Sequence, residues 1–446
     1  MTSRGRVELP GGGVTPPPRR PRAAASKNLL VMGSQSRRRA MLTVTDQVVS
    51  SGSNFATGVA VARLSGISQF GQYMVVVVFW LVLVGLHRAL ITEPMVVTSR
   101  DADDLRSRLA DGLAAEAVYG CVVGLLVAAG GGLALLGGHS LGVPLLAMSV
   151  WLPGLLIQDY WRAMAFQRAR PGAALANDTA FVIVQAVATV AFALVGWRSV
   201  GYMITAWGLG GLAGALYGFR RFPAVSRPMQ GWEMLARLWP RSRWILADFA
   251  SGYMTEQANL LLAAVLLSTV DFGGFRAAYT LIGPILILLL AEMNLGLPEA
   301  TRRACSDDPD ALAHFARRLS AVTFVCVAAY GVLLAVAGRR LLSMVYGPSF
   351  PTFSPLVSLG ALSFAVASLS TGEGIALKAG ARMSLVWRAR LFVGLVSLAS
   401  LVVLVQWLGV VGAGWSSVVT AATWAISMQV VYRLELRRSD PVGLAT

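Results

Sequence analysis

The chain has 446 residues, of which 56% are hydrophobic and 13% charged. Soluble domains carry roughly one-quarter charged residues, so this composition excludes an ordinary water-soluble domain and predicts a protein whose solvent is lipid. The net charge of +16 does not indicate a nucleic-acid partner, because the basic residues fall in alternate loops between apolar segments.

Residues 1–39 form the first distinct segment. They are rich in Pro, Gly and Arg and contain no apolar run of the length that a signal peptide needs. Such a composition cannot bury enough apolar surface to fold, so it predicts a disordered basic tail on the cytoplasmic side.

Apolar segments of the length that crosses a bilayer, roughly 17–25 residues, recur along the rest of the chain. Eight are free of charge or nearly so, and four carry a few charged residues. The stretch 391–432 is long enough for two spans, with a break near 409–414. In chain order the predicted spans are 40–62, 70–96, 117–138, 140–158, 179–197, 199–219, 244–267, 276–298, 319–338, 351–372 and the two within 391–432.

The basic residues predict the orientation of these spans. Of the 38 Lys and Arg, 32 fall in the N-terminal tail, in alternate loops or after the last span. Basic loops stay in the cytoplasm, so we expect a plasma-membrane protein with both termini inside. The five cations left on the outer side are Arg63, Arg198, Arg276, Arg339 and Arg340, and Arg88 lies within a span.

An internal repeat divides the spans into two sets of six. Asp46 aligns with Asp248, Phe70-Gly71 with Phe272-Gly273, and Arg88 with Glu292. An even number of spans per repeat predicts an all-α fold of two six-helix lobes related by an axis along the membrane normal. The expected units are the lobes 40–219 and 244–435, a cytoplasmic linker over 220–243, and a cytoplasmic tail over 436–446.

Charged residues within spans are expensive in lipid and usually face a protein interior or a wet cavity. The first, second, seventh and eighth spans hold most of them, and the first and seventh also carry polar stripes at helical spacing. The serines and threonines of the stripes alone favour hydrogen bonds between helices, and a hydrated cavity becomes the better explanation once Asp248 and Glu256 are included. The candidates for lining a cavity are Arg88, Glu292, Glu256, Asn54, Asn259 and Glu93. The candidates for ion pairs or gate contacts near the cytoplasmic side are Asp46, Asp248, Asp159, Arg162, Asp178, Glu373 and Lys378.

No pattern in the chain indicates catalysis, a cofactor or a metal. Cys121, Cys305 and Cys326 have no ligand-like spacing. His87 points about 100° away from Arg88 on an ideal helix, so its expected role is packing against a neighbouring helix. A membrane enzyme acting on an isoprenoid-linked sugar is a rival interpretation, but the outer loops hold no acidic pair for such chemistry.

Several short segments resemble the polysaccharide-transporter branch of the multidrug/oligosaccharidyl-lipid/polysaccharide flippase superfamily. They are 46–54, Ala62-Arg63-Leu64, Gln69-Phe70-Gly71-Gln72-Tyr73, Thr92-Glu93-Pro94, Arg168-Ala169-Arg170, Tyr346-Gly347 and 409–412. The resemblance covers residues 40–435 and rests on the order of these segments. It implies a V-shaped pair of lobes that flips a lipid-linked glycan by alternating access, with membrane lipid and cell-envelope glycan synthesis proteins as further partners.

Arg88 favours this substrate, because a pyrophosphate needs a basic group, whereas a cationic drug favours an acid-lined pocket. An ion-coupled multidrug exporter and a transport-inactive scaffold for envelope synthesis stay open as alternatives. The repeat places Arg88 opposite Glu292. We expect either a switch, in which Glu292 replaces the substrate as the partner of Arg88, or a static ion pair between the lobes.

Overall fold

The computed structural model describes residues 22–99, 102–222, 228–251, 253–304, 309–380 and 382–439. Helices fill nearly all of these ranges, and none of the ranges contains a β-strand. Eight helical segments are long and apolar enough to cross a bilayer, and a pair bent by 45° would add a ninth. The chain is therefore a multi-pass membrane protein with an all-α fold.

The first half begins with the longest helix, α1 (Arg22–His87), which contains two spans. They meet at Gly66, where φ is 82° and ψ is 172°, a conformation open essentially to glycine alone. A π-helical turn, η1 (Arg88–Thr92), follows directly. The other helices of this half are α2 (Glu93–Thr98), α3 (Ala102–Ser107), α4 (Leu109–Leu136), α5 (Gly142–Gln167), α6 (Pro171–Val195) and α7 (Val200–Arg221).

The second half begins with α8 (Pro228–Ser251) and α9 (Tyr253–Leu266). The expected boundary between linker and lobe at residue 243 falls inside α8, because Met234 and Leu238 are buried and α8 packs on α4 and η1. The remaining elements are α10 (Thr269–Leu281), α11 (Gly283–Ala304), α12 (Pro309–Tyr346), η2 (Pro351–Phe353), α13 (Ser354–Ser368), α14 (Thr371–Ala379), α15 (Met383–Leu408) and α16 (Val410–Ser439).

Part of the tail that was expected to be disordered is helical in the structure. Residues 22–39 belong to α1, whereas residues 1–21 lie outside the described ranges, as do residues 440–446 of the predicted C-terminal tail. The last proline of the tail is Pro21, so nothing in 22–39 interrupts a helix by removing a backbone donor.

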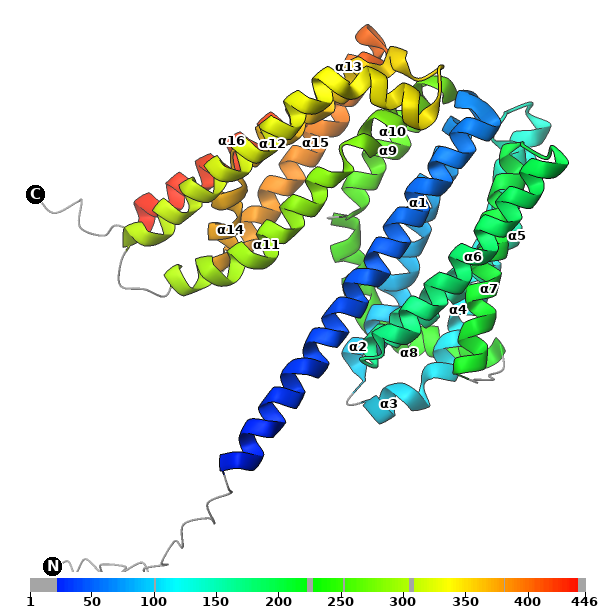
Figure 1. Ribbon diagram of the computed structural model, residues 1–446, viewed down its shortest axis with the longest axis horizontal. Helices are drawn as coiled ribbons and strands as arrows, with labels where there is room; N and C mark the ends of the chain where they lie inside the picture. Colours follow the sequence, from blue (N-terminus) through cyan, green and yellow to red (C-terminus); the bar gives the residue numbers. More distant parts are fainter. Residues whose placement is uncertain are drawn as a thin grey trace, which may run out of the picture.

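The helices form two lobes that meet at one end and diverge toward the other (Figure 1). At the meeting end α1 packs against α10. Phe70 and Phe272, which align in the repeat, are fully buried there. A Cβ on Gly71 would lie 1.7 Å from the carbonyl oxygen of Thr269, so the two backbones touch where a side chain would separate them.

Tight turns join the spans at this same end. Five of them contain a glycine with positive φ: Gly66, Gly138, Gly196, Gly347 and Gly409. Ser268 serves instead between α9 and α10, where its hydroxyl accepts a hydrogen bond from the backbone of Asp271. All six are the turns that the sequence predicts to lie outside.

Candidate functional site

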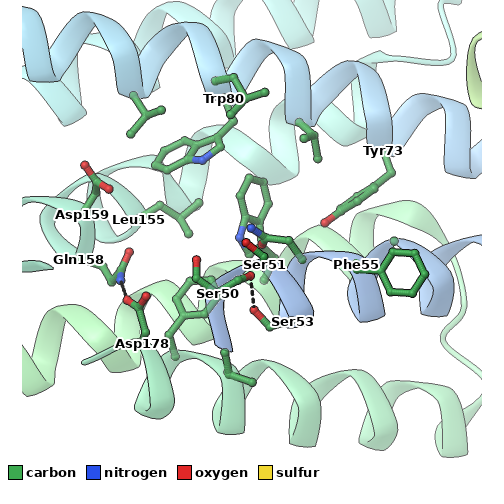
Figure 2. A pocket seen from close by; sticks show the side chains of 18 of the residues that line it. Ser50, Ser51, Ser53, Phe55, Tyr73, Trp80, Leu155, Gln158, Asp159 and Asp178 are labelled. Atoms are coloured by element: carbon green, nitrogen blue, oxygen red, sulfur yellow. Dashed lines mark hydrogen bonds between the residues drawn. The ribbon is translucent and has the colours of Figure 1, made fainter. Parts of the chain in front are cut away.

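A cavity of about 530 Å³ lies between the two limbs of α1 and the helices α5, α6 and α7. Figure 2 shows the serines of the first limb and Trp80 of the second limb around the same space, with Asp159 and Asp178 at one end. The second lobe completes the wall through α10 and α12. The polar lining residues are Ser50, Ser51, Ser53, Asn54, Tyr73, Arg88, Gln158, Asp159, Arg162, Asp178, Arg276, Thr280 and Tyr346.

Arg88 holds Asp159 with two hydrogen bonds. Its Nε donates to Oδ2 at 2.9 Å and its Nη2 donates to Oδ1 at 2.5 Å. The Arg88 side chain is nevertheless 42% exposed, whereas that of Asp159 is 9% exposed. The guanidinium therefore reaches the cavity wall while it holds the carboxylate of Asp159.

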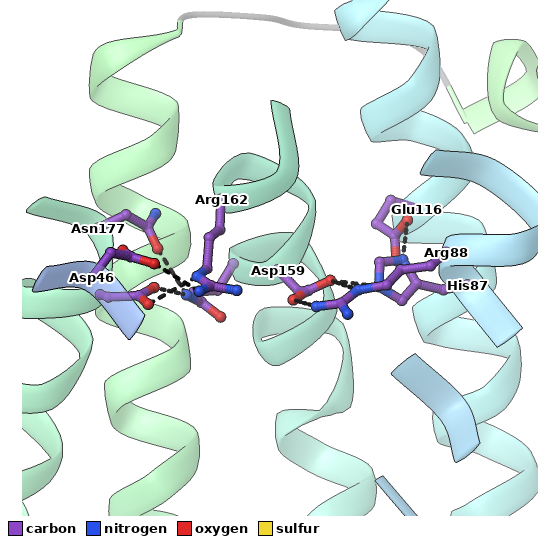
Figure 3. A network of polar contacts seen from close by, with 9 residues as sticks. Asp46, His87, Arg88, Glu116, Asp159, Arg162 and Asn177 are labelled. Atoms are coloured by element: carbon purple, nitrogen blue, oxygen red, sulfur yellow. Dashed lines mark hydrogen bonds and ion pairs between the residues drawn. The ribbon is translucent and has the colours of Figure 1, made fainter. Parts of the chain in front are cut away.

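Behind this pair lies His87, which is completely buried (Figure 3). Its Nε2 is 2.8 Å from Asp159 Oδ2, and its Nδ1 is 3.0 Å from Glu116 Oε2. Glu116, on α4, is also fully buried. Three helices thus meet through one imidazole ring and two carboxyl groups.

A second buried cluster surrounds Arg162. Its Nη2 donates to Asp46 at 2.7 Å and its Nε donates to Asp178 at 2.8 Å. Gln158 donates to both Asn177 and Asp178. These bonds fix the first limb of α1 to α5 and α6 at the level of the cavity (Figure 3).

Arg276 brings a third guanidinium to the cavity, from the second lobe. The sequence assigned it to the outer side, but α10 carries it one turn past the seam and into the cavity wall. Its Nε is buried and has no hydrogen-bond partner among the described residues.

The structure does not bring all the candidate cavity residues together. Arg88 and Asn54 line the cavity. Glu93 is exposed on α2, and the side chain of Glu256 lies outside the described residues. Asn259 lines a second cavity of about 370 Å³ between α9, α13, α15 and α16.

Glu292, the repeat partner of Arg88, is buried in its own lobe. It accepts a hydrogen bond from Thr323 at 2.5 Å, and its second oxygen is buried without a partner among the described residues. Arg88 is held by Asp159 instead. The expected pairing of Arg88 with Glu292 is therefore not present in this conformation, because each side chain finds a nearer partner within its own lobe.

The candidate gate residues also separate into two groups. Asp46, Arg162 and Asp178 form one cluster, and Asp159 joins Arg88 and His87. Asp248 is exposed on α8. Glu373 accepts a hydrogen bond from Ser320 at 2.7 Å, and Lys378 Nζ donates to Met293 Sδ at 3.7 Å. Neither residue belongs to a gate ion pair in the described part of the chain.

Besides Arg276, two functional side chains escaped the sequence reasoning. His87 was expected to pack, because an ideal helix turns it away from Arg88. Glu116 immediately precedes the uncharged run 117–138 and was not counted as part of a span. The signal that could have found both is the spacing of acids on the neighbouring spans, since a buried histidine requires a polar partner.

Within the described ranges, no group of His, Cys, Asp or Glu side chains is arranged to hold a metal ion. Cys121 and Cys326 are free and exposed on their helices. The chemistry of the cavity is thus carried by guanidinium, carboxyl, imidazole and hydroxyl groups.

Comparison with known proteins finds solved structures that share this architecture. No protein-family model and no curated protein matches the sequence. Among solved structures, the lipid II flippase MurJ in an inward closed conformation matches with a TM-score of 0.68 at 11% identity, covering 88% of this chain and 87% of that chain. An inward-facing multidrug resistance MATE transporter of the MOP superfamily matches with a TM-score of 0.62 at 13% identity, covering 89% and 96%.

The chain shares its fold with these MurJ and MATE structures. A third structure, a MATE protein in its bent conformation, agrees with a TM-score of 0.54 at 12% identity over 91% of this chain and 95% of that chain. The expected all-α membrane fold, similar to that of MATE proteins, is thus confirmed. Sequence identities this low support a shared fold only, so the substrate has to be inferred from the cavity.

Proposed function

We propose that this chain is a flippase that carries an isoprenoid-diphosphate-linked glycan from the inner to the outer leaflet. The supporting observation is that two guanidinium groups, Arg88 of the first lobe and Arg276 of the second, face one cavity. Planar guanidinium groups match the oxygens of phosphate with paired hydrogen bonds. A diphosphate between the lobes would be bound from both sides.

Both groups are available to a ligand in the way this function requires. Arg88 has Asp159 as an internal anion, and its side chain is 42% exposed. Arg276 keeps a buried Nε without a partner among the described residues. Buried donors left unsatisfied are costly, so an anionic ligand would stabilise the site by supplying the missing acceptor.

The remaining lining suits the sugar part of such a substrate. Ser50, Ser51 and Ser53 line one side with Asn54. Trp80 and Trp207 pack edge to face at 5.6 Å between ring centroids on the other side. Hydroxyl and amide groups can bond the hydroxyls of a sugar, and aromatic rings provide broad apolar surface beside them.

The proposed direction follows from the positive-inside count, which places the meeting end of the lobes outside and both termini in the cytoplasm of a plasma membrane. In this orientation the lobes diverge toward the cytoplasm (Figure 1). A cysteine at Ser140 should react with an impermeant reagent from outside, and cysteines at Ser107 and Ser384 should not. Gly409 has positive φ, so Gln406 is the better second outer position. Labelling of Ser107→Cys without labelling of Ser140→Cys would contradict the proposed orientation.

Transport itself is testable with purified protein in lipid vesicles. The probe is a fluorescent polyprenyl-diphosphate sugar, and an impermeant quencher reports which leaflet holds it. We expect the wild-type chain to move the probe and Arg88→Ala or Arg276→Ala to slow it by about 10- to 100-fold, the range for losing charge-assisted hydrogen bonds of roughly 1.5–3 kcal/mol.

The matched control is Arg198→Ala, which removes a guanidinium from an exposed outer turn and should leave the rate unchanged. Movement of a cationic dye in place of the diphosphate probe would support the multidrug-exporter alternative. Movement of neither probe by folded wild-type protein would support the scaffold alternative.

A further inference from the structure

His87 lies between two carboxyl groups, and the two contacts of its ring determine how many protons the group of residues holds. A neutral imidazole has one N–H donor and one acceptor nitrogen, and an ionised carboxylate only accepts. Yet Nδ1 lies 3.0 Å from Glu116 and Nε2 lies 2.8 Å from Asp159. Both contacts are hydrogen bonds only if the ring carries two protons or one carboxyl group carries one. In either arrangement the cluster holds one proton more than a neutral ring with two carboxylates.

Arg88 completes the charge balance of this proton cluster, which consists of His87, Arg88, Glu116 and Asp159. The guanidinium and the additional proton together neutralise the two carboxylates. Asp159 Oδ2 lies 2.8 Å from His87 Nε2 and accepts from Arg88 Nε at 2.9 Å, so the imidazole and the guanidinium share one carboxyl oxygen. Any change at Arg88 therefore reaches the imidazole without movement of the backbone.

The charged groups around the proton cluster do not supply a spare cation. Arg162 is already shared between Asp46 and Asp178, so one guanidinium there serves two carboxyl groups. Tyr119 and Tyr160 donate their hydroxyls to backbone carbonyls. On α2, α4 and α8 the other charged side chains are all exposed or partly exposed; they are Glu93, Asp111, Glu233, Arg237, Arg241, Arg243 and Asp248.

We propose that the proton cluster is a proton-binding site coupled to the ligand: when a diphosphate takes Arg88 away from Asp159, the cluster binds one further proton from water. This inference rests on the proposed function. Removing the guanidinium would leave two buried carboxylates with one proton, and an uncompensated buried charge costs several kcal/mol. A proton on the Asp159 oxygen that Arg88 vacates restores neutrality.

The local backbone supports a site built for exchange. Arg88 begins the π-helical turn η1, and such turns are rare and concentrate at functional positions. Of the proton cluster only Arg88 and Asp159 line the cavity, because His87 and Glu116 are fully buried. The ligand can thus replace one partner while the rest stays in place.

Calorimetry of the purified full chain in detergent measures the coupling directly. Farnesyl diphosphate is the probe, farnesol is the control without the anion, and titrations in two buffers of different ionisation enthalpy give the protons exchanged. At pH 8, where a phosphate is fully ionised, we expect uptake of about one proton and a Kd that rises up to about tenfold per pH unit. Binding of the diphosphate with no proton uptake overturns this inference alone.

Two variants separate coupling from a structural role. Asp159→Asn removes the carboxylate that competes for Arg88, so it should bind farnesyl diphosphate more tightly and take up no proton. Glu373→Gln removes a buried carboxyl group of the other lobe and should keep the wild-type proton count. An unchanged count in Asp159→Asn contradicts the assignment, and if that variant does not fold the wild-type count decides. Failure of the wild-type chain to bind the diphosphate would defeat the proposed function as well.

Discussion

The two lobes share a fold but differ in how they use polar residues. In the first lobe, buried side chains form ion pairs around Arg162 and Asp159. The described ion pairs of the second lobe join Glu299 to Arg302 and Arg303, and Arg382 to Glu435, near the helix ends. Its interior is bonded through hydroxyls instead, with Thr420 donating to Ser397 at 2.7 Å and Ser400 lying 2.9 Å from Ser416.

Positions that align in the repeat show where the lobes diverged. Phe70 and Phe272 remain fully buried at the seam. Asp46 is 1% exposed, whereas Asp248 is exposed on α8. The packing residues thus preserve the symmetry of the fold, and the charged residues break it. The first lobe holds the ion chemistry, and the second supplies Arg276 and the surface against which the first lobe closes.

The strongest test of this difference removes a central cation from each lobe. Arg162→Met leaves Asp46 and Asp178 buried without a cation, which should lower the free energy of unfolding by about 3–5 kcal/mol. Lys378→Met is the matched change in the second lobe, where the lysine is only partly buried, and should cost far less. The midpoint of thermal unfolding in detergent measures both. Equal losses would remove the contrast between the lobes.

The seam should respond to a single methyl group. Gly71→Ala places a Cβ where the carbonyl oxygen of Thr269 lies, and overpacking of this kind costs about 1–3 kcal/mol. Disulfide formation between cysteines at Ser68 and Thr269, whose hydroxyls are 3.2 Å apart, should fall several-fold. Gly52→Ala, with no atom within 4 Å of its Cβ, should leave the yield unchanged, and the reverse order would mean that the seam tolerates separation.

Glu292 tests whether the second lobe contributes an acid to the cycle. Because it bonds Thr323 in this conformation, Glu292→Gln should keep diphosphate binding and slow turnover, by a few-fold for a perturbation of about 1 kcal/mol. Vesicle transport and calorimetry report the two quantities separately. Weaker binding with unchanged turnover would assign Glu292 to the ligand site and end the idea of a switch.

The hydroxyl bonds of the second lobe should matter least. Thr420→Val removes the donor to Ser397 and should change stability by about 0.6 kcal/mol, the average for polar contacts between membrane helices. The same unfolding assay measures it beside Arg162→Met. A loss as large as that of Arg162→Met would show that the second lobe also depends on its polar interior.

Much of the fold was predictable from the sequence because the bilayer imposes length and composition on every span. The spans and the turns at 138, 196 and 409 correspond to uncharged runs bounded by glycine or charge. The packing of α8 on α4 and η1 was not predicted, because it joins segments that lie far apart in the sequence.

The candidate site was predictable only where a residue is unusual by itself. Arg88 is conspicuous within a span, and the structure places it at the cavity wall. The partners of Arg88 depend on three-dimensional packing: Asp159 lies 71 positions away along the chain, and the π-helical turn departs from ideal helical spacing. Arg276 was misplaced because loop counting cannot tell whether a cation near a span end points outward or into the protein.

The five glycines with positive φ have a consequence for how the protein enters the membrane. Each closes a turn with few residues between consecutive helices, so in the proposed orientation almost no polar chain has to be translocated. Adjacent spans can therefore insert as helical hairpins during synthesis, and only small turns cross the hydrocarbon. A larger side chain in the left-handed conformation of such a turn would act first on insertion of its hairpin, before the lobes have formed.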